Sequence, residues 1–119
     1  MNNKSKGRVG EELAVEFLKK KGIKIIETNW RYSRFGEIDI IVLDNNILAF
    51  VEVKTRTTEN FGHPLEAINM KKILQIRSTA QAYIHENPEL KVKGYRFDAV
   101  SVILSKEPKI TYHKDIYQA

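Results

Sequence analysis

The chain has 119 residues, and its 20 Lys and Arg outnumber 15 Asp and Glu, which gives a formal net charge of +5. This length fits one domain around one hydrophobic core, and a hydrophobic content of 42% is too high for a disordered chain. The absence of cysteine excludes disulfides, thiolate metal sites and a cysteine nucleophile.

No stretch of the sequence predicts association with a membrane. The longest apolar run has five residues, whereas a membrane-spanning helix needs roughly 20. The first ten residues contain no apolar segment of the kind found in secretory signals. Because there are also no cysteines to indicate an oxidising compartment, we expect a cytoplasmic protein.

Apolar residues at helical spacing predict a first helix over residues 9–21. Around the helix axis, Glu11 falls on the shoulder of the apolar stripe that contains Leu13, whereas Glu12 falls on the opposite, solvated side. Gly22 ends the helix after three lysines, which suit the negative end of the helix dipole. We therefore expect Glu11, and not Glu12, to face other elements.

Three strands are predicted next. Residues 23–28 form a short β-type run, residues 29–36 are expected to be a loop, and residues 37–43 and 47–54 form two more strands. Between the last two, Asn45-Asn46 tolerates the left-handed conformation that a tight turn requires. We therefore predict a β-hairpin.

The second half of the chain predicts a loop over residues 56–64, a helix over 64–86, a strand over 95–104 and a short strand over 110–113. A hairpin combined with helical crossovers indicates a mixed sheet flanked by helices. We therefore expect a single α/β domain over residues 1–119, with the first six residues flexible.

The predicted turn also sets which hairpin residues oppose each other. With Asn45-Asn46 as the loop, opposed residue numbers sum to 91, so that Asp39 faces Glu52. Lys54 lies two positions beyond Glu52 and shares its face. A slip of one residue would move Asp39 to the other face. In this register, two carboxylates and an ammonium converge on strands that are otherwise apolar.

This convergence lies within an acidic part of a basic chain, since residues 36–62 carry a net charge of −3. A basic surface attracts polyanions, whereas adjacent carboxylates repel unless they are protonated or bridged by a cation. Two carboxylates can hold Mg²⁺ for attack of water on a phosphoryl group, and a nearby Lys can assist. The alternative is a solvated network of Asp, Glu and Lys without a metal.

The same residues carry a family resemblance. The segments Gly36-Glu37-Ile38-Asp39 and Phe50-Val51-Glu52-Val53-Lys54-Thr55-Arg56 resemble the PD-(D/E)xK signature of the restriction-endonuclease-like superfamily. Over nearly its whole length the chain resembles the YraN-like family of small bacterial proteins, which are similar to archaeal Holliday-junction resolvases. Further landmarks of the resemblance are Gly7-Arg8-x-Gly10-Glu11, Asn29-Trp30-Arg31, Phe61-Gly62-x-Pro64-x-Glu66-Ala67, Lys71 and Arg96-Phe97-Asp98.

The resemblance implies a restriction-endonuclease-like core and an endonuclease, dependent on Mg²⁺ or Mn²⁺, that hydrolyses phosphodiesters in branched or recombination-related DNA. It implies that Asp39 and Glu52 bind the metal, that the Val53 carbonyl adds a ligand and that Lys54 is catalytic. Glu11 matches the helix glutamate that completes the resolvase site. The analogy also suggests a homodimer, since cutting a symmetric junction needs two sites.

Basic residues near the hairpin are candidates for binding nucleic acid. Arg31 and Arg34 alternate with aromatic residues, a mixture that can hold phosphates and stack on bases. Trp30, however, is expected to pack against the first helix. Further candidates are Arg56, just past the hairpin, and Lys71 and Lys72, which begin the polar face of the second helix. Each charge is equally consistent with a solvated surface.

Two other functions are consistent with the sequence. One is a nucleic-acid-binding module without catalysis, and the other is an interaction protein whose acidic hairpin docks a basic partner. The intact set of Asp39, Glu52 and Lys54 favours the nuclease, because a degenerate enzyme commonly loses one such residue. Asp98 interrupts an apolar strand, and we expect it to pair with an arginine such as Arg96 or Arg31.

Overall fold

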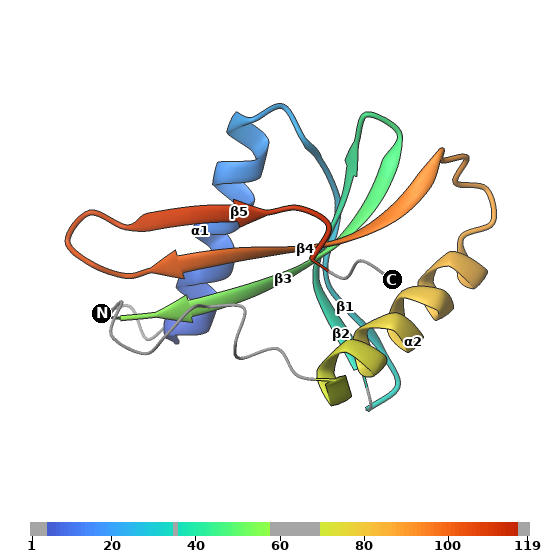
Figure 1. Ribbon diagram of the computed structural model, residues 1–119, viewed down its shortest axis with the longest axis horizontal. Coiled ribbons are helices and arrows are strands. Elements are labelled where there is room, and N and C mark those ends of the chain that lie inside the picture. The colour runs from blue at the N-terminus through green and yellow to red at the C-terminus, as the bar shows by residue number, and fades with distance from the viewer. Residues whose placement is uncertain (1–4, 35, 58–69, 117–119) are drawn as a thin grey trace.

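The computed structural model describes residues 5–34, 36–57 and 70–116. A five-stranded sheet in the order β1-β2-β3-β4-β5 has one helix on each face (Figure 1). Strands β3 and β4 are parallel, and the other neighbours are antiparallel. The predicted α/β fold is therefore confirmed. The elements are α1 (Lys6–Lys20), β1 (Lys24–Tyr32), β2 (Gly36–Asp44), β3 (Ile47–Arg56), α2 (Met70–Glu86), β4 (Gly94–Ile103) and β5 (Lys109–His113).

Helix α1 begins three residues earlier than predicted because Ser5 caps it. The Ser5 hydroxyl accepts a hydrogen bond from Arg8 N at 3.2 Å, which satisfies one of the donors that a helix start leaves open. The helix ends at Lys20, one residue earlier than predicted, and Gly22 follows it with a φ of 82°, which is easily adopted only by glycine. As predicted from the helix periodicity, Glu11 is half-buried and Glu12 is exposed.

Strand β1 is longer than predicted. It continues to Tyr32, where a loop was expected, and Trp30 and Arg31 pair with Ile38 and Glu37 of β2. Asn29 has a φ of 52° within this strand. The asparagine therefore marks an irregularity inside a paired strand rather than the loop that its composition suggested.

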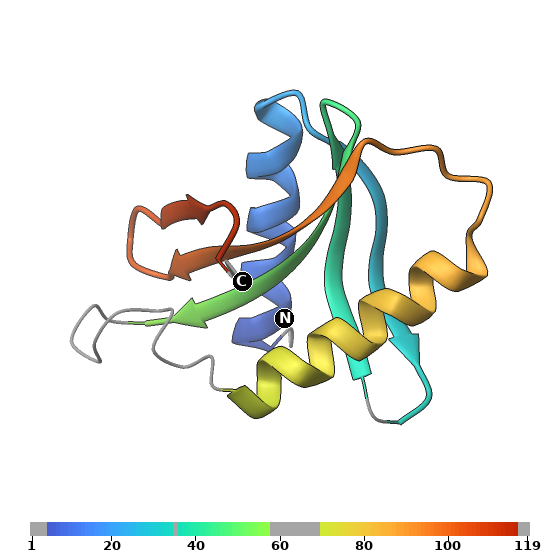
Figure 2. The same ribbon diagram turned by 45° about the vertical axis from the view of Figure 1, so that its right-hand side comes forward.

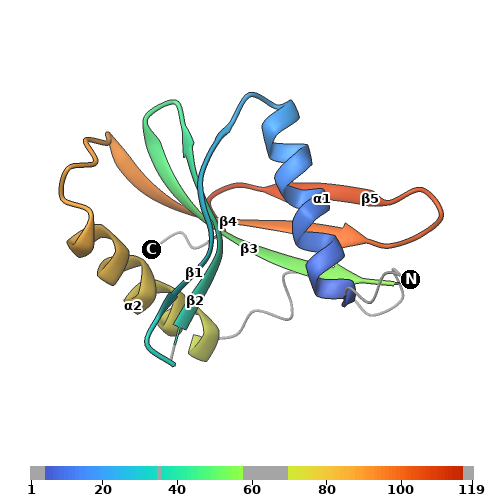
Figure 3. The ribbon, with the colours of Figure 1, turned by 180° about the vertical axis from the view of Figure 1, so that it is seen from behind.

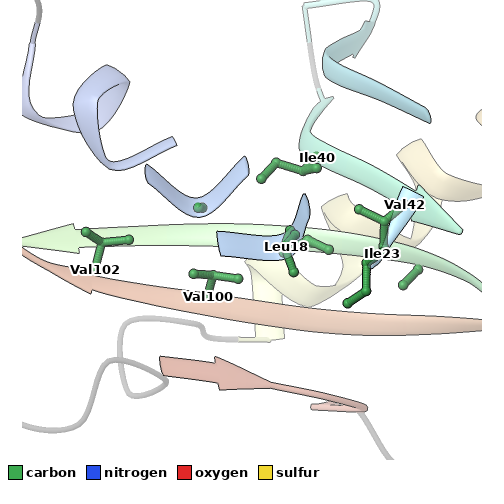
Figure 4. Close-up of a cluster of buried hydrophobic side chains, with 9 residues drawn as sticks. Leu18, Ile23, Ile40, Val42, Val100 and Val102 are labelled. Carbon is green, nitrogen blue, oxygen red and sulfur yellow. The ribbon is translucent and has the colours of Figure 1, made fainter. Parts of the chain in front are cut away.

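Each face of the sheet buries a separate apolar cluster. Under α1, buried residues of the helix pack on β2, β3 and β4, and Figure 4 labels Leu18, Ile23, Ile40, Val42, Val100 and Val102. On the opposite face α2 packs over a second cluster. Because both faces are covered, the consecutive residues Ile40, Ile41 and Val42 are all fully buried.

Trp30 belongs to the second cluster. Its ring lies 5.1 Å from that of Tyr83 in α2, edge to face, and stacks on Tyr32 at 6.0 Å. The prediction that Trp30 packs against a helix is thus confirmed, but the predicted partner, the first helix, was wrong. Trp30 packs against the second helix, α2.

Two glycines bring the helices close to the central strands. A methyl group at Gly10 of α1 would overlap Thr55 Oγ1 of β3, and one at Gly36 of β2 would overlap Thr79 Oγ1 of α2. Glycine is the residue that permits such an approach of backbone to a neighbouring element. The two helices are therefore held against opposite faces of the sheet, at the start of β2 and the end of β3.

Strands β2 and β3 separate toward the end that these helices approach. Figures 2 and 3 show β2 and β3 side by side at the hairpin turn and diverging along their length, with α1 and α2 on either side. We call this divergence the fork.

No helix in the described part of the chain is long and apolar enough to cross a membrane. Residues 58–69, which include the predicted start of the second helix and the landmark from Phe61 to Ala67, lie outside the described residues.

Candidate functional site

The predicted hairpin register is confirmed. The turn residues Asn45 and Asn46 have φ values of 50° and 67°, and pairing runs from Asp44 and Ile47 to Ile40 and Val51. The two residue numbers of each pair sum to 91, as predicted.

Asp39 lies where the fork opens. Its Oδ2 atom accepts a hydrogen bond from the backbone N–H of Val53 in β3, with 2.8 Å between the two atoms. The Asp39 side chain therefore points across the fork toward β3. This geometry brings it next to the Val53 backbone and near Glu52.

Two lysines approach Glu52 from different elements. Glu52 Oε1 is 4.0 Å from Lys54 Nζ on the same strand and 3.6 Å from Lys72 Nζ on α2. The Glu52 side chain is only 9% exposed. A buried carboxylate with two ammonium groups at the outer limit of ion pairing is incompletely neutralised, because neither distance is that of a strong charged hydrogen bond.

The surroundings of Asp39 and Glu52 disfavour the charged form of each carboxylate and raise its pKa. Burial and the charge of Asp39 together raise the pKa of Glu52 to about 7, although Lys72 and Lys54 oppose the shift. Burial also raises the pKa of Asp39, against the opposing hydrogen bond from Val53 N. Perturbed carboxylates of this kind are common at functional sites.

Glu11 joins the site from the α1 face. Burial and then the charge of Asp39 raise the pKa of Glu11, while a hydrogen bond with Asn29 lowers it. Glu11 and Asp39 line one open groove of about 420 Å³, which we call the α1-side groove. The choice of Glu11 over Glu12 from the helix periodicity is thus consistent with its place near Asp39.

A second groove reaches Asp39 from the opposite face of the sheet. This α2-side groove has a volume of about 230 Å³ and is lined by Arg31, Arg34, Glu37, Lys72 and Gln75 in addition to Asp39. Asp39 is therefore accessible from both faces, because it lies within the fork and not on one side of a continuous sheet.

Lys72 lies in the site, a placement that differs from the one predicted from the sequence. It was assigned to the polar face of the second helix, but it lies four positions before the buried Ile76 and turns toward Glu52. Residues four apart share a helix face, so this spacing was the signal that could have found it. Lys71, one position earlier, is exposed as expected.

The other basic candidates lie around the fork at different depths. Arg31 is exposed and pairs with Glu37, with its Nη2 atom 2.7 Å from Glu37 Oε2. Arg34 is exposed in the α2-side groove, and Arg56 is half-buried at the end of β3.

Asp98 belongs to a separate polar cluster. It pairs with Arg96, as expected, at 2.8 Å from Arg96 Nε. Arg96 also bonds Asp44 at 3.0 Å, and Tyr112 donates to Asp98. We call Asp44, Arg96, Asp98, Tyr112 and Lys114 the Arg96 cluster.

Asp39 and Glu52 are the side chains that could hold a hard divalent cation. Among residues 5–34, 36–57 and 70–116, no three His, Cys, Asp or Glu side chains form a group that could enclose a metal. Mg²⁺ is commonly bound by one or two carboxylates and keeps several waters. Two close carboxylates whose mutual repulsion a cation would relieve fit that donor set.

A model of the uncharacterised protein family UPF0102 matches residues 10–102, a range that contains all the candidate site residues. The chain belongs to this family. It is 44% identical to a UPF0102 protein from Dictyoglomus turgidum over 110 residues, which cover 92% of each chain. A UPF0102 protein from Natranaerobius thermophilus is 41% identical over 119 residues, covering 98% of this chain and all of the relative. The resemblance to YraN-like proteins is confirmed at this family level.

Proposed function

We propose that this UPF0102 protein is a metal-dependent endonuclease that hydrolyses phosphodiester bonds in DNA, including branched intermediates of recombination or repair. The observation that carries the proposal is the fork, where Asp39 and Glu52 approach each other beside Lys54 and Lys72 in an apolar sheet. The resemblance of these segments to the PD-(D/E)xK signature supports the same conclusion. The net charge of +5 supports a polyanionic substrate.

Asp39 and Glu52 would hold Mg²⁺ or Mn²⁺, with the Val53 carbonyl as a backbone ligand and Glu11 on the α1 side. A bound cation of this kind supplies Lewis-acid polarisation of the phosphoryl oxygen and lowers the pKa of water. Burial, and after it repulsion from Asp39, raises the pKa of Glu52. A cation that neutralised both carboxylates would remove the repulsion.

Lys54 is the catalytic lysine in this proposal. Its ammonium lies at the edge of the carboxylate pair, 4.0 Å from Glu52, where it can orient the attacking water or stabilise charge that develops on the phosphoryl oxygens. The water oxygen bonds to phosphorus and the bond to the 3′ oxygen breaks. That oxygen takes a proton, which leaves a 3′-hydroxyl and a 5′-phosphate.

The test is cleavage of linear, flapped and four-way DNA with and without Mn²⁺. Asp39→Asn and Glu52→Gln should each lower the metal-dependent rate by at least about 10³-fold, since each removes a charge on which the site depends. Glu11→Gln should lower it less, and Glu86→Gln is the control, since Glu86 is an exposed glutamate at the end of α2 that is not among the residues lining either groove.

Equal cleavage by wild type and Asp39→Asn would overturn the proposal and indicate a contaminating nuclease. Tight, salt-sensitive DNA binding without turnover on any substrate would instead favour a binding module of the same fold. Calorimetry with Mn²⁺ alone, on wild type and Asp39→Asn, checks the metal site independently of cleavage.

A further inference from the structure

The fork offers a polyanion two routes to Asp39, one from each face of the sheet. The α1-side groove and the α2-side groove both include Asp39 in their walls. Among the described residues, each of these two grooves is a route by which a phosphate backbone can reach Asp39. Which route it takes would determine how DNA lies on the protein.

The two grooves differ sharply in charge. Among the described residues that line the α1-side groove with Asp39, three are glutamates (Glu11, Glu12 and Glu16) and one is basic (Arg8). Among those that line the α2-side groove with Asp39, three are basic (Arg31, Arg34 and Lys72) and one is a glutamate (Glu37). With Asp39 included, the described lining has a net charge of −3 in the α1-side groove and +1 in the α2-side groove. A cleft with an excess of one sign of charge attracts ions of the other sign, so of these two grooves the α2-side groove favours phosphates.

The basic residues of the α2-side groove also form a path into the site. Arg34 is an exposed residue of this groove, whereas Lys72 is half-buried and its Nζ atom lies 3.6 Å from Glu52 Oε1. Ser33 and Gln75 also line this groove and carry polar side chains. Positive charge and polar side chains thus continue from solvent to the carboxylates.

We propose that the DNA backbone enters the site through the α2-side groove, and that Lys72 binds the phosphate adjoining the carboxylate pair. This inference rests on the proposed function and adds the direction of approach. Without DNA, the Lys72 ammonium lies against Glu52. When a phosphate arrives, the long side chain exchanges this weak ion pair for a charged hydrogen bond to a phosphate oxygen.

Arg34→Ala and Arg8→Ala form a matched pair, because each removes one exposed arginine from one groove. We would measure binding of a fluorescent DNA oligonucleotide by anisotropy in EDTA, over a range of salt concentrations. Arg34→Ala should weaken binding about tenfold and reduce the slope of log K against log salt by about 1. Arg8→Ala should change the affinity by less than about twofold. The opposite order, or equal effects, would overturn the α2-side route.

Lys72→Gln tests the inner end of the path. It should weaken DNA binding about tenfold without weakening Mn²⁺ binding measured alone by calorimetry, because it removes a cation that competes for Glu52. Lys72→Arg should restore most of the DNA affinity, and circular dichroism checks that both variants fold. Loss of Mn²⁺ binding in Lys72→Gln, or unchanged DNA affinity, would contradict the assignment.

These results separate the route from the function. If the wild type cleaves DNA and the α2-side variants do not change DNA binding, the route is wrong while the proposed function stands. If the wild type neither binds nor cleaves any DNA tested, the proposed function is wrong and the route falls with it.

Discussion

Two clusters of charged residues lie in this sheet, and they differ in how well their charges are matched. In the Arg96 cluster, the Asp98 side chain is 0% exposed and accepts hydrogen bonds from Arg96 at 2.8 and 3.0 Å, from the Tyr112 hydroxyl, and from Asp115 N at 2.9 Å. In the fork, the nearest cations to Glu52 are two ammonium groups at 3.6 and 4.0 Å, and a second carboxylate lies close by.

The difference appears in the ionisation of the carboxylates. Burial alone would raise the pKa of Asp44, but hydrogen bonds from Arg96 and Lys114 lower it below its usual value. Burial and Asp39 raise the pKa of Glu52 instead. A satisfied cluster stabilises the fold, whereas an unsatisfied one persists at a cost and has the properties of a binding site. The Arg96 cluster is therefore structural, and the fork is the functional candidate.

The largest expected effect is on stability in the Arg96 cluster. Asp98→Ala should lower the free energy of unfolding by about 3–5 kcal/mol, because it leaves the largely buried Arg96 guanidinium without its main partner. Urea denaturation measures this loss. The double variant Arg96→Met/Asp98→Leu should cost less than Asp98→Ala, since it leaves no unpaired charge. A loss below about 1 kcal/mol for Asp98→Ala would show that the cluster is not structural.

The pH dependence of stability should have opposite signs in the two clusters. The folded pKa of Glu52, about 7, lies above its unfolded value of 4.5, so the stability it contributes is present below pH 4.5 and lost as the pH rises through 7. This loss is on the order of 3 kcal/mol. Asp44, with a lowered pKa, contributes stability above its unfolded pKa of 3.8 that is lost as the pH falls.

Urea denaturation at a series of pH values between 4 and 8 would measure the Glu52 contribution. Glu52→Gln should flatten the decline in stability toward neutral pH, because glutamine does not titrate. If the variant shows the same decline as the wild type, then Glu52 does not carry the unfavourable charge.

The close approach of α1 to the fork can be tested at two glycines of the same helix. Gly10→Ala should destabilise the protein by about 1–3 kcal/mol, because the added methyl group overlaps Thr55 Oγ1. Gly7→Ala is the control, since an added methyl at Gly7 meets nothing within 4 Å. That substitution should stabilise the helix by about 0.5–1 kcal/mol. Thermal denaturation of both variants gives the comparison, and equal shifts would contradict the close contact.

The smallest effect is expected at the exposed ion pair between Arg31 and Glu37. The Arg31 side chain is 69% exposed, so solvent screens the pair and Glu37→Gln should cost about 0.5 kcal/mol or less. Urea denaturation at low and high salt measures it. If Glu37→Gln lowered the free energy of unfolding as much as Asp98→Ala, the buried Arg96 cluster and the exposed pair would not differ in their contribution to stability.

Local patterns in the sequence predicted much of the fold and part of the site. The Asn45-Asn46 turn correctly predicted the hairpin register, and helix periodicity correctly separated Glu11 from Glu12. Both depend on residues close together in the chain, where turn geometry and helical repeat leave few alternatives. The continuation of β1 past Asn29 was missed, because asparagine usually signals a turn and here lies within a strand held by its pairing with β2.

What the sequence determined by itself is which residues share a face: Glu11 toward the core side of its helix, and the carboxylates of the hairpin on facing strands. Only the tertiary structure decided their partners. Lys72 meets Glu52 from α2, Asp44 meets Arg96 across 52 positions of the chain, and divergence of β2 from β3 opens Asp39 to both faces. A periodic pattern in the sequence indicates which side of its own helix or strand a residue occupies. The distance between two elements depends instead on how their faces pack, including the close contacts that Gly10 and Gly36 allow.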